Sequence, residues 1–245
     1  MITIKTDNEL NLMREPCQII RDALLLAQEK IKVGMTTKEL DKIIHDYIIS
    51  SGAKPSFLGY GGFPSSTCIS IDEQVVHGFP SNRIIKEGEI VSVDVGAFKN
   101  GFHADAARSF YVGSIDPEKK RLIEVTRECF FKGIEGICIG SSLGDIGAQI
   151  QQHAEQSGFS VVRDMVGHGI GRNLHEDPQV PNYGRKGTGI RLKRNMTLAI
   201  EPMINMGDYR VEIDGWKCVT VDGKPSAHYE NTVVITDNGV EILTL

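Results

Sequence analysis

The sequence predicts an α+β protein built from two similar halves. Helical patterns come in two pairs, each made of a long pattern, a glycine and a shorter pattern. Each pair is followed by segments rich in β-branched residues, which are typical of strands. No linker rich in proline or serine divides the 245 residues. We therefore expect one domain over 1–245, with halves at roughly 1–115 and 116–245 and a site between them.

The first helix pair is expected near the N-terminus. From Asp7 through Lys32 apolar residues recur at intervals of three and four, which predicts a long amphipathic helix. The next pattern begins after Gly34, with Thr36 and Thr37 as candidate caps, and stops at Gly52.

The second pair, 117–137 and 141–157, repeats this plan. A shift of 106 positions places Gly34 on Gly140 and Thr36 on Ser142. A pseudo-two-fold relation between the halves would explain the match. Few residues are identical, so a chance alignment of two amphipathic helix pairs is the alternative.

Strand patterns follow each helix pair. Residues 90–98 and 102–113 flank Asn100-Gly101, and Asn-Gly between two such runs is the strongest short hairpin signal. Later strands are expected at three further places: 196–204, 219–223 and 229–236. A turn at 237–239 leads into the terminal strand.

Composition excludes several classes of protein. With 40% hydrophobic and 24% charged residues, the chain is globular rather than disordered or fibrous. Its net charge of -5 argues against nucleic acid as the main partner. The start has no secretory signal, and no apolar run approaches the roughly 20 residues of a membrane helix, so we expect a soluble cytoplasmic protein. The five cysteines form no CxxC pair and are expected as reduced thiols.

The hairpin brings two aspartates together. With a two-residue Asn-Gly turn, Asp94 pairs with Ala107 and Asp105 pairs with Gly96, so both aspartates share one face as diagonal neighbours. Carboxylates that converge in an apolar sheet repel one another and lose hydration, so a shared proton, an arginine or a metal ion has to compensate. Arg108 points to the opposite face. We therefore favour a cation, and a solvated edge hairpin is the alternative.

Three histidines and two glutamates offer further ligands. His168 and His175 lie in a Gly-rich segment that argues against a helix, and His77 ends an apolar stretch before a glycine. Glu201 and Glu230 interrupt apolar strand patterns, where an unpaired carboxylate is costly. Each residue alone is more often structural, but the whole set points to a metal centre. The other four histidines have no such context and are interpreted as structural: His45, His103, His153 and His228.

The donor set suits hard or borderline divalent ions. Asp, Glu and His without cysteine fit Mn, Fe(II), Co or Zn, and sequence cannot choose among them. Four carboxylates exceed what one ion needs, so we expect two ions about 3.5–4 Å apart that share a water and lower its pKa. A non-haem iron oxygenase is an alternative, but its triad of two histidines and one carboxylate fits four carboxylates badly.

Five segments, in this order, resemble the type I methionine aminopeptidases of bacteria: DEQVVHGFP, IVSVDVGAFKNGFHAD, GHGIGRNLHEDPQVPNYG, TLAIEPM and HYENTVVIT. The resemblance covers essentially the whole chain. It implies the pita-bread (creatinase/aminopeptidase) fold, in which two pseudo-symmetric halves of a helix pair plus antiparallel strands enclose the site.

By motif, the resemblance also implies roles for the site residues. Five residues would be the ligands of a dinuclear metal centre: Asp94, Asp105, His168, Glu201 and Glu230. Asp105 and Glu230 would bridge the ions, and Glu201 would also move a proton as general base and then acid. His175 would hydrogen-bond the scissile carbonyl and its oxyanion, and His77 would contact the amide on the leaving side.

The methionine side chain would enter an apolar pocket near residues 57–63. Four aromatic residues are the candidates for its wall: Phe57, Tyr60, Phe63 and Trp216. An ordinary core role for these aromatics is the alternative. Leu174 stands where many relatives carry an aromatic residue. Asp72 replaces the more usual Asn, which puts an auxiliary monovalent-cation site in doubt.

The implied reaction is metal-dependent hydrolysis, in which a metal-bridging hydroxide attacks the first peptide bond. The substrate would be the initiator methionine of new polypeptides with a small second residue, at the ribosome after deformylation, and the enzyme a monomer. An Xaa-Pro aminopeptidase or prolidase shares the fold, but it usually carries an extra N-terminal domain for which 245 residues leave no room. A non-catalytic pita-bread binding protein is the other alternative, although such proteins have lost metal ligands and all five are kept here.

Overall fold

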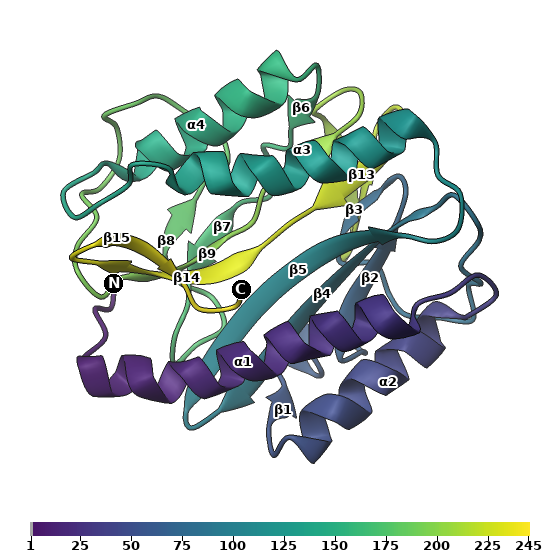
Figure 1. The fold of residues 1–245 in the computed structure, drawn as a ribbon, viewed down its shortest axis with the longest axis horizontal. Coiled ribbons are helices and arrows are strands. Elements are labelled where there is room, and N and C mark those ends of the chain that lie inside the picture. Colours follow the sequence, from purple (N-terminus) through teal and green to yellow (C-terminus); the bar gives the residue numbers. More distant parts are fainter. Residues whose placement is uncertain (1) are drawn as a thin grey trace.

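Two pairs of helices enclose the strands from opposite sides. The computed structural model describes residues 2–245 (Figure 1). On one side lie α1 (Asp7–Lys30) and α2 (Thr37–Ser50), and on the other lie α3 (Pro117–Ile134) and α4 (Leu143–Gln156). All four helices occur where the sequence predicts them. Helices α1 and α3 end earlier than expected because the residue that follows each one has an extended backbone.

The second helix of each pair begins in the same way. Thr36 caps α2, and Glu39 accepts a hydrogen bond from the Thr36 N–H at 2.7 Å. Ser142 precedes α4, and Asp145 accepts a hydrogen bond from the Ser142 N–H at 2.8 Å. Both cap residues also form an isolated antiparallel bridge to a loop further along the chain. The positions that the sequence aligns therefore have similar local structures.

The strands form four sheets. One sheet has β4 in its centre and contains β1 (Lys54–Pro55), β2 (Thr67–Ile71), β4 (Ile90–Lys99) and β5 (Phe102–Tyr111). A five-stranded sheet has the order β15-β14-β9-β7-β8, where the bounds are β7 (Gly167–Gly169), β8 (Glu176–Val180), β9 (Thr197–Ile200), β14 (Asn231–Thr236) and β15 (Gly239–Ile242). One small sheet contains β6 (Ser160–Val161), β10 (Met203–Asn205) and β13 (Ser226–His228). The other contains β3 (Gln74–Val76), β11 (Val211–Asp214) and β12 (Lys217–Thr220). A short 3-10 helix, η1 (Tyr60–Gly62), precedes β2.

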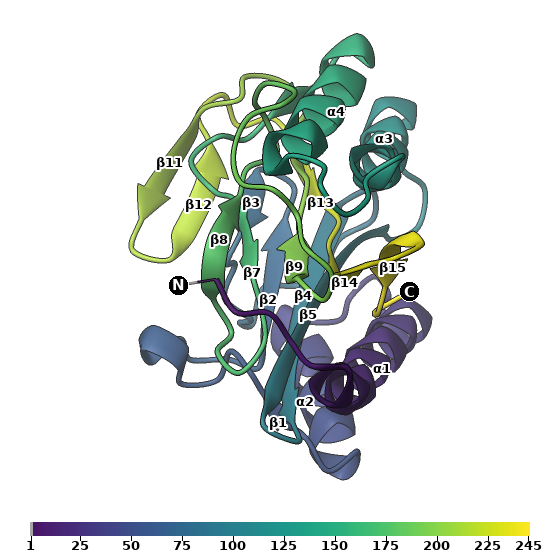
Figure 2. The same ribbon diagram turned by 90° about the vertical axis from the view of Figure 1, so that its left-hand side faces the viewer.

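Each helix pair packs on its own hydrophobic core. Val91, Val93 and Val95 of β4 belong to the core that is shared with α1 and α2. The other core joins α3 and α4 to β9, β10 and β14. Because strand side chains alternate between faces, the opposite face of β4 and β5 is left for polar residues. In Figure 2, β5 lies beside β14, and both β4 and β5 contact β13, so this polar face looks toward the second half of the chain.

The β4–β5 hairpin has the register that the sequence predicts. Asp94 pairs with Ala107, and Gly96 pairs with Asp105. Both residues of the Asn-Gly turn have positive φ, 55° and 82°, as a type I′ turn requires. The prediction that the two aspartates share one face is confirmed.

The predicted strands around the two glutamates are wrong in detail. The strand expected over 196–204 is broken at Glu201-Pro202 into β9 and β10, because proline has no N–H to give to a ladder. The strand expected over 229–236 begins at Asn231, so Glu230 lies between β13 and β14. Both glutamates therefore lie at strand junctions rather than inside strands.

The cysteines and the helices were both subjects of expectations from composition. All five cysteines are free, four of them buried and Cys138 exposed. Within residues 2–245, no helix is both long enough and apolar enough to cross a membrane.

Candidate metal centre and active site

Four carboxylates converge on the polar face of the β4–β5 hairpin. Asp94 lies on β4 and Asp105 lies on β5, while Glu201 and Glu230 come from the strand junctions of the second half. All four line one cavity of about 610 Å³. The structure thus brings together four carboxylates that the sequence analysis predicted as ligands and that lie in separate segments of the chain.

Hydrogen bonds between β5 and β14 hold Asp105 near Glu230. The Thr232 hydroxyl accepts from the Asp105 N–H at 3.0 Å and donates to the Asp105 carbonyl at 2.8 Å. Ala107 and Glu230 exchange backbone hydrogen bonds of 3.3 and 3.0 Å. These contacts join residues up to 127 positions apart, which no local pattern in the sequence could have paired.

Arg108 binds the backbone of Glu230 and forms no ion pair with its carboxylate. The guanidinium donates to Asn231 Oδ1 at 2.7 Å and lies over the Tyr229 ring, 4.2 Å from its centroid. It also donates to the backbone carbonyl of Glu230. The prediction that Arg108 points away from the aspartates is confirmed, so the compensating charge has to come from elsewhere.

His168 on β7 presents one ring nitrogen to the carboxylates. Its Nδ1 contacts the Gly169 carbonyl at 2.8 Å, and its Nε2 lies 3.8 Å from Asp105 Oδ2 and 3.8 Å from Glu201 Oε1. The backbone carbonyl of Glu201 accepts a hydrogen bond of 2.9 Å from the buried Asn182 side chain. Because Nδ1 is the nitrogen that faces a carbonyl, the lone pair is on Nε2 and points at the carboxylates.

Burial raises the pKa of all four carboxyls. The pKa of Asp94 rises to about 7, with burial as the largest cause. The pKa values of Asp105, Glu201 and Glu230 lie well above their ordinary range, because neighbouring carboxylates add to the effect of burial. Within residues 2–245, three carboxylate oxygens are buried without a hydrogen-bond partner: Asp94 Oδ1, Asp105 Oδ1 and Glu230 Oε1. Divalent cations would satisfy these oxygens and favour the charged carboxylates.

Two groups of donor atoms have the spacing of metal ligands. The donors of Asp105, His168 and Glu230 lie within 4.8 Å of one another, and so do those of Asp94, His228 and Glu230. Glu230 belongs to both groups, as a bridging ligand does. Oxygen and imidazole donors without a thiolate suit hard or borderline divalent ions, so the residues present fit a metal centre.

Two further histidines border the cavity above the carboxylates. His175 Nδ1 lies 2.7 Å from the Tyr60 hydroxyl, and the His175 ring meets the His168 ring edge-on with centroids 4.3 Å apart. His77 follows β3 with a φ of 59°, and its ring meets Trp216 edge-on at 5.8 Å. Burial lowers the pKa of His77 to about 4 and the pKa of His168 to about 3, so both are neutral at pH 7.

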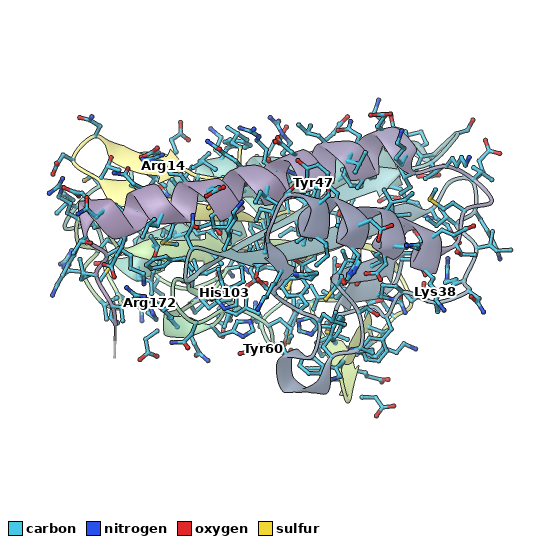
Figure 3. All side chains as sticks on the ribbon, turned by 90° about the horizontal axis from the view of Figure 1, so that it is seen from below. Arg14, Lys38, Tyr47, Tyr60, His103 and Arg172 are labelled. Atoms are coloured by element: carbon cyan, nitrogen blue, oxygen red, sulfur yellow. The ribbon has the colours of Figure 1, made fainter. Side chains whose placement is uncertain are left out.

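The four predicted aromatic residues form one wall of this cavity. Figure 3 shows Tyr60 on η1, which projects beyond the layer formed by α1 and α2. Phe63 meets the Phe57 ring edge-on at 6.5 Å and the Trp216 ring at 5.4 Å. Leu174 is 2% exposed and packs in the same cluster. These rings enclose apolar space directly beside the carboxylates.

Asp72 and His228 have partners in the structure that the sequence did not identify. Asp72 lies outside the cavity lining and binds the Lys119 ammonium at 2.8 and 2.9 Å. His228, which the sequence left as structural, is 1% exposed and faces Glu201 and Glu230. The alternation of an extended chain puts residues 228 and 230 on the same side, and that signal was available in the sequence.

A comparison with protein families decides the relationship. The family model of metallopeptidase family M24 matches residues 11–237. The chain belongs to metallopeptidase family M24. Among its M24 relatives is the methionine aminopeptidase of Clostridium perfringens, which is 57% identical over all of this chain and 99% of that protein. The methionine aminopeptidase 1 of Bacillus subtilis is 48% identical over 100% of this chain and 99% of that protein.

Solved structures of M24 peptidases share the fold. The methionine aminopeptidase of Thermotoga maritima has a TM-score of 0.98 at 48% identity, over 100% of this chain and 99% of that one. The prolidase of Pyrococcus furiosus has a TM-score of 0.81 at 25% identity, over 99% of this chain and 65% of that one. The pita-bread fold is therefore confirmed. The comparisons support a metal-dependent hydrolase, an aminopeptidase that removes N-terminal methionine.

Proposed function

We propose that this M24 peptidase removes the initiator methionine of newly made polypeptides and uses two divalent ions to do so. The observation that carries the proposal is the set of buried carboxylates and one imidazole at an aromatic-walled cavity. The ions would be held by five residues: Asp94, Asp105, His168, Glu201 and Glu230. Bound divalent ions polarise a carbonyl oxygen and lower the pKa of a coordinated water.

The ligands would divide between the two ions according to their positions. Glu230 belongs to both donor groups, and Asp105 lies beside Glu230, so these two carboxylates would bridge. Asp94 would serve one ion, and His168 with Glu201 would serve the other. Oxygen and imidazole donors accept Mn, Fe(II), Co and Zn, so the supply of metal decides which ion is used.

Glu201 would move the proton of the reaction. Its pKa is raised by burial and by the two aspartates, which suits a group that takes a proton from water and then gives it to the departing amine. The Asn182 hydrogen bond to the Glu201 carbonyl holds the backbone of this residue in place.

His175 would stabilise the scissile carbonyl as charge develops on its oxygen. When the Tyr60 hydroxyl donates to His175 Nδ1, the ring carries its proton on Nε2 and can donate that proton to the carbonyl. His77 lies across the cavity against Trp216 and would contact the amide on the leaving side.

The aromatic wall would select methionine as the first residue. A thioether makes favourable contacts with aromatic rings, and Phe57, Phe63 and Trp216 line the cavity. The free amine of the substrate would bind at the metal centre, which confines cleavage to the first peptide bond. Formylation turns the amine into an amide, whose nitrogen has no free lone pair for a metal ion, so deformylation would come first. The enzyme would act at the ribosome as a cytoplasmic monomer, on chains with a small second residue.

A panel of peptides tests this function. Chelated protein, reconstituted with Mn or Co, would be incubated with matched Met-Gly-, Met-Lys- and Ala-Pro-initiated peptides, and the released residue identified by mass spectrometry. We expect metal-dependent release of Met from the Met-Gly peptide only. Release of Ala from the Ala-Pro peptide would instead support an Xaa-Pro aminopeptidase. An absence of cleavage with every metal would overturn the proposal in favour of a binding protein.

A further inference from the structure

His228 is a buried imidazole whose ring nitrogens form no hydrogen bond in the described part of the chain. Its side chain is 1% exposed, and within residues 2–245 neither Nδ1 nor Nε2 has a hydrogen-bond partner. Buried polar groups in native proteins are almost always paired, so two unpaired nitrogens on one ring indicate a missing partner. The reaction assigned above makes no use of this residue.

The Nε2 atom of His228 has the same surroundings as that of His168. It lies 3.7 Å from Glu230 Oε2 and 3.8 Å from Glu201 Oε2. The corresponding distances from His168 Nε2 to its two carboxylates are both 3.8 Å. These separations are too long for hydrogen bonds. Two donors that each lie about 2.1 Å from one ion can be up to about 4.2 Å apart, so the separations fit ligands of a shared cation.

The backbone holds the ring in this position from two sides. The Ser109 hydroxyl accepts from the His228 N–H and donates to the His228 carbonyl, both at 2.9 Å. On the other side His228 pairs with Met203 in the β13–β10 ladder. A side chain that is fixed at both backbone groups is preorganised toward the carboxylates and needs no large movement to reach an ion.

We propose that His228 is a further metal ligand, which donates Nε2 to the ion held by Asp94 and Glu230. The three donor atoms lie within 4.8 Å of one another. Each of the two ions then has one imidazole, His168 on one and His228 on the other. This inference rests on the two-ion function proposed above. A neutral nitrogen donor adds no charge to the centre and shifts its preference from Mn toward Co and Zn.

The test compares His228→Gln with the matched control His153→Gln, which changes an imidazole on α4 that is bound to Glu128. Calorimetric titration of the chelated proteins with Co(II) should give two bound ions in the unmodified protein and in the control. Replacing a residue that only hydrogen-bonds a metal ligand lowers metal affinity roughly 10- to 100-fold. Loss of a direct ligand in His228→Gln should therefore lower the Co(II) affinity of one of the two sites by at least this factor. A crystal structure of the Co-loaded unmodified protein should show Nε2 about 2.1 Å from one ion.

The outcomes separate this inference from the proposed function. Two tight sites of unchanged affinity in His228→Gln, or an Nε2 that contacts Glu201 and no ion, would overturn the role of His228 while leaving the two-ion centre intact. Failure of the unmodified protein to bind Co(II) and release methionine would overturn both proposals. The crystal structure of the unmodified protein keeps the inference testable even when His228→Gln does not fold.

Discussion

Burial decides the ionisation of the residues around the cavity. The same environment lowers the pKa of His168 to about 3 and raises the pKa of Asp94 to about 7, because it disfavours the charged form of each. A neutral imidazole can bind a metal ion, and a carboxyl with a raised pKa gives up its proton when a cation arrives. The sequence could identify these residue types but not their burial, since burial depends on how the two halves meet.

Asp94→Asn removes the charge of one expected ligand with little change in shape. We expect loss of one bound ion and a fall in kcat for a Met-Gly peptide of at least about 100-fold. Metal content by mass spectrometry and peptide turnover check this. Asp46→Asn, an exposed position on α2, is the matched control and should change neither quantity. Two bound ions with full activity in Asp94→Asn would remove this residue from the site.

His175→Ala separates stabilisation of the carbonyl from metal binding. We expect kcat to fall roughly 10²–10³-fold, because the variant loses a donor to the developing oxyanion, while both ions stay bound. Tyr60→Phe removes the hydroxyl that fixes the His175 tautomer and should cause a smaller fall in kcat. Unchanged kcat in His175→Ala, measured with the full metal content, would contradict this role.

Local sequence signals predict the β4–β5 hairpin of the site well and the strand junctions at Glu201 and Glu230 poorly. The Asn-Gly turn sets the register of β4 and β5, so the shared face of Asp94 and Asp105 follows from the sequence alone. Glu201 and Glu230 lie at strand junctions that the apolar runs around them conceal. Their approach to Asp105 depends on contacts between β5 and β14, which belong to different halves and have no signature in either segment.

Gly96 on β4 is required for the aromatic wall. A Cβ at this position would lie 2.7 Å from the Phe57 ring and 2.8 Å from Ser56 Cβ, so Gly96→Ala should displace Phe57. We expect a rise in KM for Met-Gly peptides that exceeds any change in kcat, and a loss of about 1–3 kcal/mol in the free energy of unfolding from overpacking. Steady-state kinetics and denaturant unfolding measure the two effects.

Gly158→Ala is the control for this substitution. Gly158 has a φ of 86° and nothing within 4 Å of an added Cβ, so its replacement strains only the backbone. It should lower the free energy of unfolding and leave KM unchanged. An equal rise in KM in both variants would show that Gly96 has no special relation to the methionine pocket.

At the scale of the whole molecule, the candidate ligands come from both halves. Asp94 and Asp105 come from the predicted first half, and His168, Glu201 and Glu230 come from the second. The sequence predicted the two helix pairs because apolar residues recur at intervals of three and four. The alternation of an extended chain puts residue 228 on the side of Glu230, but it could not show that this side faces the junction, because it carries no information about which sheet the strand will join.

Removal of the metal should make stability depend on pH. A carboxyl whose pKa is raised on folding contributes stability below its unfolded pKa, and that contribution is lost as pH rises through the folded pKa. Above about pH 7.5 histidines with lowered pKa values are neutral in both states, and their contribution no longer changes. Since the pKa of Asp94 is about 7 and those of its neighbours lie well above their ordinary range, the contribution of these carboxyls to the stability of the metal-free protein should still be falling at pH 7.

Bound ions should flatten this dependence. Mn(II) at 100 times its Kd should add about 2.7 kcal/mol to the free energy of unfolding for each bound ion, because only the folded chain assembles the ligands. Denaturant unfolding at pH 7 and pH 8, with chelator and with Mn(II), measures both effects. The same change in stability between the two pH values with chelator and with Mn(II) would contradict the raised pKa values.

The central claim is that the buried carboxylates hold two ions between the halves. Crystals of the chelated protein, soaked in Mn(II) and measured near the manganese absorption edge, test it most directly. The account predicts two anomalous peaks about 3.5–4 Å apart, with Asp105 and Glu230 touching both. Peaks only at the surface, or none in the cavity of a protein that still releases methionine, would contradict it.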